Sequence, residues 1–236
     1  MRVTATPIDN QQRGFTLLEL MVVVVIIGLL AAYDDHLAGE FPGVKTLALW
    51  TSEPNVMIMR NKEIHSPADL AGLKIRVAGA TAAEVAVALG ATPVQMPISE
   101  VYNALQTGLI DGVFTGSSTL IDFKLDEVAD AIILGAPLGR LTFYTVMTQA
   151  KYDALPADQQ AAIDAVAGEV LSKSAEEAWY ATANASLEAA RADSKNVMVD
   201  LTADEIAAFS AAIQGVVDSY VASVDGASTL AAMRGE

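Results

Sequence analysis

The N-terminal part of the chain contains a segment that is long and apolar enough to cross a membrane. Glu19 is the only charged residue between Phe15 and Ala32. As a helix these roughly 18 residues would be roughly 27 Å long, which suits the hydrocarbon core of a bilayer. A carboxylate at this depth is costly unless it is paired or close to the interface. The segment therefore predicts one membrane helix whose glutamate has a binding partner.

The residues before this helix predict its orientation. Arg2 and Arg13 precede the apolar segment, so the positive-inside rule places the leader in the cytoplasm and the rest of the protein across the membrane. A secretory signal peptide would have a small-residue cleavage site after its apolar region. Here Gly14 comes before that region. A plain signal anchor is the alternative interpretation, and it leaves Glu19 without a role.

The block from Arg13 to Leu20 (RGFTLLEL) resembles the class III signal of type IV prepilins and pseudopilins. The resemblance implies that a prepilin peptidase cleaves after Gly14 and methylates the new amino terminus at Phe15. It also implies that Glu19 pairs with the terminal amine of a neighbouring pilin-like subunit. In that family the helix continues beyond the membrane as a stalk. Here Gly and Pro residues between Tyr33 and Gly43 interrupt it, so the sequence predicts insertion without a stalk.

Charge and composition exclude several functions. The formal net charge is −15, and residues 1–32 contribute none of it because their two basic and two acidic residues cancel. An acidic body argues against nucleic acid as a partner, but not against a small anion that responds to the local field. The absence of cysteine excludes disulfides and thiolate chemistry. The two histidines, His36 and His65, lack metal-ligand spacing, so we predict no metal site and no cofactor.

Between Val44 and Thr115 short apolar runs alternate with helical segments. Strands are predicted at 44–50, 56–59, 73–78, 92–96 and 113–115. Helices are predicted at 81–89 and at 100–107 with Ser99 as N-cap, and a one-turn helix begins at Ser66 and Pro67. Gly72, Gly90 and Gly108 close these helices. The alternation predicts a mostly parallel sheet covered by helices.

The C-terminal half is predicted to be largely helical. Before it, helical turns are predicted at 117–122 and 125–129, and strands at 131–134 and 141–148. Residues 158–192 form one predicted helical segment with an apolar stripe. Thr202 and Glu205 form a T-x-x-E capping box that opens a second helix. The predicted apolar face of that helix contains Ile206, Phe209, Ile213, Val216, Val217 and Tyr220.

Three stretches of the body resemble the solute-binding proteins of TRAP transporters, the dicarboxylate-binding type. They are Ser66 to Val77 (SPADLAGLKIRV), Gly90 to Met96 (GATPVQM) and Glu100 to Gly112 (EVYNALQTGLIDG). The resemblance covers roughly residues 44–233. It implies a two-lobed α/β receptor that closes on a small organic acid and delivers it to membrane permease subunits. Most of the first lobe of that family has no counterpart here, so we expect one lobe, the C-terminal helices and an exposed strand edge.

The resemblance also implies which residues bind the ligand. In the family the arginine of the L-K-I-R-V strand forms a salt bridge with the ligand carboxylate, and Arg76 stands at that position. A guanidinium suits this role because it grips a carboxylate with two parallel hydrogen bonds. A polar segment after the D-G pair contacts the carboxylate, and here it contains Thr115, Gly116 and Ser117. Phe114 and Phe143 could line the pocket or belong to the core, and the core is the favoured interpretation for each. Gln106 and Asp111 are expected to fix a helix end and turn rather than to bind ligand.

These patterns predict four parts and two possible functions. The parts are a leader (1–14), a pilin-like transmembrane helix (15–32), a linker (33–43) and a TRAP-type domain (44–236). The first function is that of a solute-binding protein held by a single span in the bacterial inner membrane, with its domain in the periplasm. The second is that of a type IV pilin-like or pseudopilin subunit. The junction between the two segments fits a natural remnant or an artificial fusion. No catalytic motif is present, so we predict no enzyme activity.

Overall fold

The computed structural model describes Gly39 and residues 41–234. The predicted leader and membrane helix, with Gly14, Phe15 and Glu19, lie outside the described residues. The elements in chain order are β1 Val44–Thr51, β2 Asn55–Met59, η3 Pro67–Leu70, β3 Lys74–Val77, α2 Ala80–Ala88, β4 Thr92–Gln95, α3 Ile98–Thr107, β5 Gly112–Gly116, α4 Thr119–Asp122, η4 Leu125–Glu127, β6 Ala131–Leu134, β7 Thr142–Thr148, α5 Gln149–Asp153, α6 Ala157–Asp164, α7 Glu169–Ala192, β8 Val197–Asp200, α8 Ala203–Ser223 and α9 Ala227–Arg234.

A six-stranded sheet forms the centre of the larger domain, with strand order β4-β3-β5-β2-β6-β8. Strand β3 is parallel to β4 and β5, and β6 is parallel to β8. Strand β2 is antiparallel to both of its neighbours. The expectation of a mostly parallel sheet is therefore confirmed, with β2 as the one reversed strand of the six. An apolar strand buried on both faces looks the same in sequence whichever way its neighbours run.

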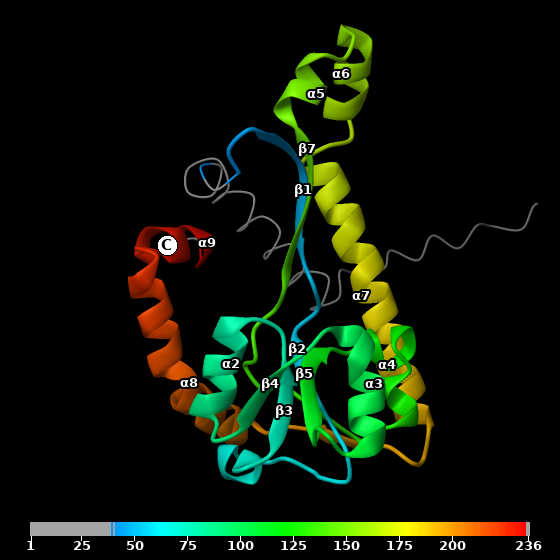
Figure 1. The fold of residues 1–236 in the computed structure, drawn as a ribbon, viewed down its shortest axis with the longest axis vertical. Coiled ribbons are helices and arrows are strands. Elements are labelled where there is room, and N and C mark those ends of the chain that lie inside the picture. Colours follow the sequence, from blue (N-terminus) through cyan, green and yellow to red (C-terminus); the bar gives the residue numbers. More distant parts are fainter. Residues whose placement is uncertain (1–38, 40, 235–236) are drawn as a thin grey trace, which may run out of the picture.

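Helices cover both faces of this sheet (Figure 1). Strand β2 is buried along its whole length, and its side chains divide between the hydrophobic clusters on the two faces of the sheet. Met57 and Met59 pack in the cluster with α2 and α8, whereas Val56 and Ile58 pack in the cluster with α3 and the C-terminal part of α7. Because successive side chains of a strand point to opposite faces, the residues of β2 alternate between the two hydrophobic cores.

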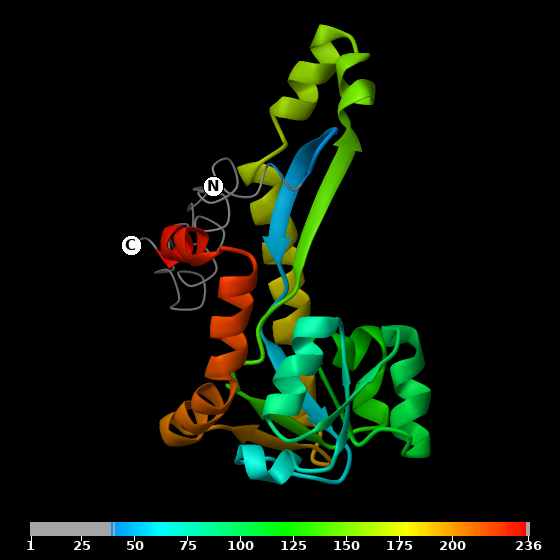
Figure 2. The same ribbon diagram turned by 60° about the vertical axis from the view of Figure 1, so that its left-hand side comes forward.

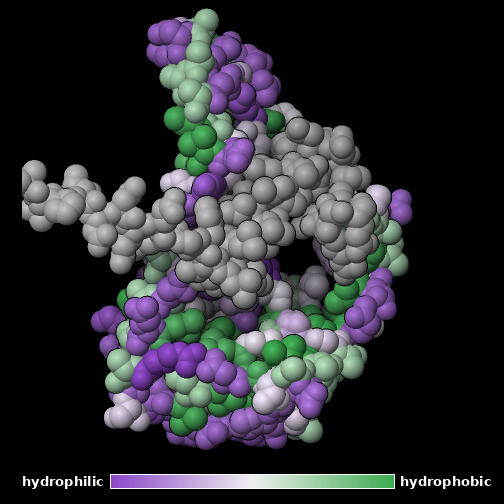
Figure 3. Space-filling model, turned by 180° about the vertical axis from the view of Figure 1, so that it is seen from behind, coloured by the Kyte–Doolittle hydropathy of each residue, from purple (hydrophilic) through white to green (hydrophobic). Residues whose placement is uncertain are grey.

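A two-stranded antiparallel ribbon, β1 paired with β7, extends away from the six-stranded sheet. Helices α5 and α6 lie at its far end, and α7 returns from there to the sheet domain (Figures 1 and 2). Lys45 of β1 connects the ribbon to this tip by an ion pair of 2.6 Å with Asp164 and by lying 4.1 Å from the centre of the Tyr152 ring. Seen from behind, the tip is mostly hydrophilic (Figure 3).

Helix α7 covers part of the outer edge of β1. The backbone N–H of Gly168 donates to the Leu47 carbonyl at 2.7 Å, and the Leu49 N–H donates to Ser172 Oγ at 3.0 Å. An uncovered strand edge exposes backbone groups to pairing with other chains. Over this part of β1, contacts with α7 therefore cover the strand edge.

Several further expectations are corrected by the structure. The segment 158–192 is two helices, α6 and α7, because Gly168 adopts a φ of +71° and turns its N–H to β1. Helix α3 begins at Ile98 with Pro97 as N-cap, so Ser99 lies in its first turn. Strand β8 was not predicted. In α8 only Phe209 and Ile213 of the predicted face are buried, while Tyr220 is half exposed.

The capping box of α8 is confirmed and gives the first prediction. The Glu205 N–H donates to Thr202 Oγ1, and the Thr202 N–H donates to Glu205 Oε2 at 2.7 Å. Thr202→Ala should lower the free energy of unfolding by about 1 kcal/mol, because the cap of a long helix is lost. Thr202→Ser keeps the hydroxyl and should cost less. Urea denaturation measures both, and equal losses for the two variants would contradict the role of the cap.

Candidate functional site: a buried arginine at the carboxyl edge of the sheet

The carboxyl ends of β3 and β5 meet at one edge of the sheet because the two strands are parallel. Strand β2 runs the other way, so its first residue, Asn55, lies opposite Gly116 at that same edge. Ligands of open α/β sheets bind outside the carboxyl ends of the strands. From the order of the strands, a ligand site is therefore expected among the residues at this edge.

A cavity of about 310 Å³ opens at this edge. Its walls come from β2, β3, β5, the start of α2, the connection between β6 and β7, and the second half of α8. The lining residues are Asn55, Arg76, Ala78, Thr81, Ala82, Val85, Phe114, Thr115, Pro137, Leu138, Gly139, Arg140, Leu141, Ile213, Val216, Val217 and Tyr220. The volume is at the lower end of the range for small-molecule sites.

Arg76 is buried at the centre of β3, with 6% of its surface exposed. Ile75 and Val77, on either side, point into the core, so the Arg76 side chain leaves from the opposite face. Its Nε donates to the Met96 carbonyl at 3.0 Å, which fixes the plane of the guanidinium. Among the described residues no carboxylate forms an ion pair with it. Burial lowers the pKa of the Arg76 guanidinium from its ordinary value.

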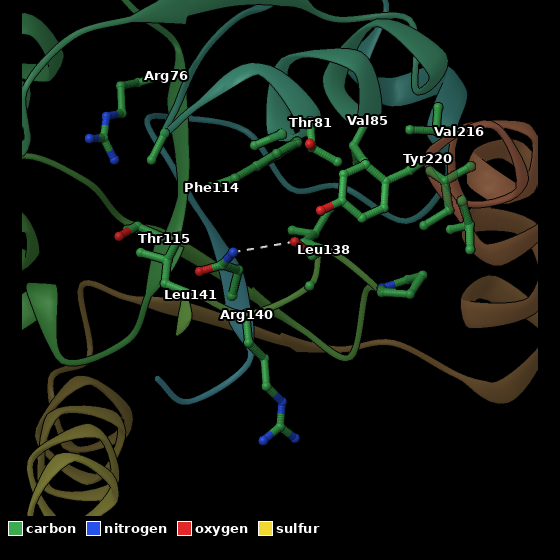
Figure 4. A pocket seen from close by; sticks show the side chains of 17 residues that line it. Arg76, Thr81, Val85, Phe114, Thr115, Leu138, Arg140, Leu141, Val216 and Tyr220 are labelled. Atoms are coloured by element: carbon green, nitrogen blue, oxygen red, sulfur yellow. Dashed lines mark hydrogen bonds between the residues drawn. The ribbon is translucent and has the colours of Figure 1, made fainter. Parts of the chain in front are cut away.

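A buried cation whose terminal N–H groups have no hydrogen-bond partner among the described residues is chemically suited to hold an anion. A guanidinium donates in a planar fork that matches the two oxygens of a carboxylate. Figure 4 shows Arg76 and Thr115 on one side of the cavity, and Val85, Phe114 and Tyr220 on the other. The cavity thus has a polar end at Arg76 and Thr115 and an opposite end with mostly apolar walls, and a second cation, Arg140, is also among its lining residues.

The four residues predicted to bind ligand fall into two groups. Arg76 and Thr115 line the cavity, whereas Gly116 and Ser117 face the junction with α7. Ser117 Oγ donates to the Ala183 carbonyl of α7 at 3.4 Å. Ser117 also lines a neighbouring hollow of about 660 Å³. The predicted ligand-binding segment therefore lies partly in the wall of the cavity and partly in the contact between the end of β5 and α7.

The carboxylate of Glu53 holds this junction together. Its Oε1 accepts a hydrogen bond from the Ser118 N–H at 2.8 Å, and its Oε2 accepts one from Trp179 Nε1. Glu53 is 3% exposed. A Cβ on Gly116 would lie 2.4 Å from Glu53 Oε1, so the absence of a side chain at Gly116 makes room for the carboxylate.

Aromatic residues stack beside the junction. The Phe143 ring lies 5.8 Å from that of Trp50 and 4.5 Å from that of Trp179, measured between centroids. Phe114 is 4% exposed and packs in the core while one side of it lines the cavity. The expectation that Phe114 and Phe143 are packing residues agrees with these contacts. Gln106 and Asp111 lie outside the lining of the cavity, and Asp111 accepts a hydrogen bond from the Lys74 N–H at 2.8 Å.

Most of the lining residues were not assigned to the site from the sequence, and Asn55 and Arg140 are polar examples. Asn55 Nδ2 donates to the Leu138 carbonyl at 3.2 Å, which is the dashed line of Figure 4. Arg140 donates through Nη1 to the Tyr180 hydroxyl. Neither belongs to a sequence motif. The antiparallel course of β2 brings Asn55 to the site, and the β6–β7 connection brings Arg140 there. Only the fold reveals these two placements.

Residues 39 and 41–234 contain no group of three or more His, Asp or Glu side chains placed to hold a metal ion. One described helix, α8, is long and apolar enough to cross a membrane by length and composition. Its Phe209 and Ile213 pack in the core of the sheet domain, which accounts for part of that apolar character.

The fold defines a periplasmic-binding-protein-like α/β domain with a cavity at the carboxyl edge of its sheet. A family model supports a narrower assignment: bacterial extracellular solute-binding protein, family 7, matches residues 31–223. The chain belongs to this family, whose members are transport components rather than enzymes. A second model, the prokaryotic N-terminal methylation motif, matches residues 9–33.

Individual relatives agree with the family. The C4-dicarboxylate-binding periplasmic protein DctP of Rhodobacter capsulatus is 31% identical over 202 residues, which are 83% of this chain and 58% of that protein. The 2,3-diketo-L-gulonate-binding periplasmic protein YiaO of Escherichia coli is 32% identical over 55% of this chain and 40% of its own length. The chain therefore spans less than two thirds of the curated relatives that it matches.

Solved structures are similar as well. A TRAP periplasmic solute-binding protein of Bordetella bronchiseptica with bound mandelate superposes with a TM-score of 0.80 and 28% identity, covering 90% of this chain and 70% of that one. A TRAP solute-binding protein of Rhodoferax ferrireducens with copurified benzoate superposes with a TM-score of 0.83 and 28% identity, covering 90% of this chain and 68% of that one.

The close approach of Gly116 to Glu53 gives the second prediction. Gly116→Ala should lower the free energy of unfolding by about 2–4 kcal/mol, because the new methyl displaces a buried carboxylate from two donors. Gly215→Ala is the matched control: nothing lies within 4 Å of its Cβ position in α8, and it should stabilise by about 0.5–1 kcal/mol. Equal effects of the two substitutions on the denaturation midpoint would contradict the packing argument.

Proposed function

We propose that the protein is a TRAP-type extracytoplasmic solute-binding protein that holds a small organic acid through Arg76. The observation that carries the proposal is a buried guanidinium, anchored through Nε, that has no carboxylate partner among the described residues. Leaving such a charge unpaired costs free energy, and a ligand carboxylate would remove that cost. Thr115, at the same end of the cavity, supplies a hydroxyl for a second contact.

The relatives support a carboxylate as the ligand. The similar structures hold mandelate and benzoate, and the Rhodobacter capsulatus relative is a C4-dicarboxylate-binding protein. All three ligands are organic acids. Gly116 and Ser117 serve the same site indirectly in this proposal, since they fix the end of β5 against Glu53 and α7.

The methylation motif supports the proposed location. Residues 1–14 act as a leader, residues 15–32 as a membrane helix and residues 33–43 as a linker, so that residues 44–236 lie in the periplasm. Prepilin peptidase and TRAP permease subunits are the proposed partners. The described sheet domain and α7 form one wall of the ligand cleft in this proposal, and another chain provides the facing wall.

The third prediction tests the ligand site. Arg76→Gln should weaken binding of organic acids by about 100-fold, the loss expected for charge-assisted hydrogen bonds to a carboxylate. Isothermal titration with benzoate, mandelate and succinate measures it. Arg60→Gln, at an exposed arginine outside the cavity, is the control and should bind as the wild type does. Equal affinities of the two variants would contradict the role of Arg76, and a wild type that binds no acid would contradict the proposed function.

A second candidate function is that of a pilin-like or pseudopilin subunit, and the methylation motif at residues 9–33 is the observation that favours it. In this case Glu19 pairs with the methylated amine of Phe15 in a neighbouring subunit. The family match over residues 31–223 makes it the weaker candidate, because it gives the solute-binding domain no task.

The fourth prediction concerns processing. The intact mass of protein isolated from its own cells should correspond to a chain that begins at methylated Phe15. Gly14→Ala should leave the leader attached, while Gly39→Ala, outside the motif, should not affect cleavage. A mature chain that begins at Met1 would contradict processing by a prepilin peptidase and would leave a plain signal anchor.

A further inference from the structure

Helix α7 and strand β1 meet along a seam with matched spacing. Gly168 bonds to Leu47 and Ser172 to Leu49, so four residues on the helix correspond to two on the strand. Four helical residues rise about 6 Å and two strand residues about 6.6 Å. Because these two rises are nearly equal, the next contact of the series is expected between residue 176 of the helix and residue 51 of the strand.

That third contact is made by an ionisable group. The Thr51 hydroxyl donates to Glu176 Oε1 at 3.1 Å. Glu176 is fully buried, and its Oε2 is buried without a hydrogen-bond partner. The first two contacts of the seam use a backbone N–H and a serine hydroxyl, which do not titrate in the physiological range. Of the three, only the Glu176 contact responds to protons.

The charged and titratable groups near Glu176 come from α7 and from two connections. Arg140 of the β6–β7 connection acts on Glu176 directly, Tyr180 lies one turn further along α7, and Glu53 of the β1–β2 connection acts on Tyr180. Arg140 donates to the Tyr180 hydroxyl and forms no ion pair with Glu176 among the described residues. Burial is the largest effect and raises the pKa of Glu176 from 4.5 to about 7, while the hydrogen bonds from Thr51 and the charge of Arg140 lower this pKa by less.

We propose that Glu176 is a proton-controlled latch in the seam between α7 and β1. The neutral carboxyl accepts the Thr51 hydrogen bond and keeps the seam closed. Loss of the proton leaves a buried negative charge that the Thr51 hydrogen bonds and the charge of Arg140 offset only in part, and the seam opens so that water can reach the charge. Because α7 and the ribbon both connect the α5–α6 tip to the sheet domain, an open seam lets the ribbon change its angle to that domain (Figure 2).

The direction of the pH dependence follows from the raised pKa. An open seam exposes Glu176 to water, where its pKa is close to 4.5, while the closed seam holds it at about 7. Between these values the open form has lost its proton and the closed form has kept it. Opening therefore becomes easier as pH rises through this window, and the effect levels off above it.

Hydrogen exchange in the full-length protein tests the latch. After correction for intrinsic exchange rates, protection of the β1 amides around Leu49 should fall about tenfold between about pH 6 and about pH 8. Glu176→Gln cannot ionise and should keep its protection constant over this range. Glu177→Gln, at the neighbouring exposed position of α7, is the matched control and should follow the wild type. Wild-type protection that does not change with pH would overturn the proposal, as would a Glu176→Gln variant that changes as the wild type does.

A second readout does not depend on the Gln variant folding. The chain contains no cysteine, so Gln106→Cys in α3 and Lys151→Cys in α5 provide two unique dye positions on exposed residues of the sheet domain and the tip. Single-molecule energy transfer should show a broader distance distribution at about pH 8 than at about pH 6. An identical distribution at both pH values would overturn the proposal.

Discussion

The buried carboxylate of Glu53 is the interaction on which the arrangement of the site depends. It follows β1, accepts a hydrogen bond from the Ser118 N–H after β5, and accepts another from Trp179 on α7. Three segments far apart in the sequence are thereby fixed to one another at the carboxyl edge of the sheet. A buried carboxylate is tolerated only when donors surround it, so its position is strongly determined. Because Gly116 has no side chain, the carboxylate can occupy the space beside its backbone.

Arg76 depends on the same edge. The strand that carries it lies between β4 and β5, and the carbonyl that anchors its Nε comes from Met96, just after β4. The cation is therefore held by backbone geometry rather than by a carboxylate. An arginine fixed in this way has little orientation entropy left to lose when a ligand carboxylate arrives, which favours binding. The seam between α7 and β1 sets the other boundary of the site, since it fixes the direction in which the ribbon leaves the sheet.

Much of the fold could be predicted from the sequence because local signals were strong. Ser66 with Pro67, Gly108 and the Thr202–Glu205 box mark helix ends by chemistry that acts within a few residues. The antiparallel course of β2, the break at Gly168 and strand β8 could not be predicted, because each depends on a partner far away in the chain. The same division applies to the site. Arg76 was found through its motif, whereas Glu53, Asn55 and Glu176 gain their roles only from tertiary contacts.

Arg76 has no carboxylate partner among the described residues, and the proposed function requires a ligand carboxylate to bind there. The most direct test is ¹⁵N NMR of the arginine side chains in the wild-type protein, with and without an organic acid such as benzoate. We expect the Nη signals of Arg76 to shift and separate as a bidentate pair restricts rotation of the guanidinium, while those of Arg60 stay unchanged. Unchanged Arg76 signals on saturation with a bound acid, or a shift at Arg140 instead, would contradict it.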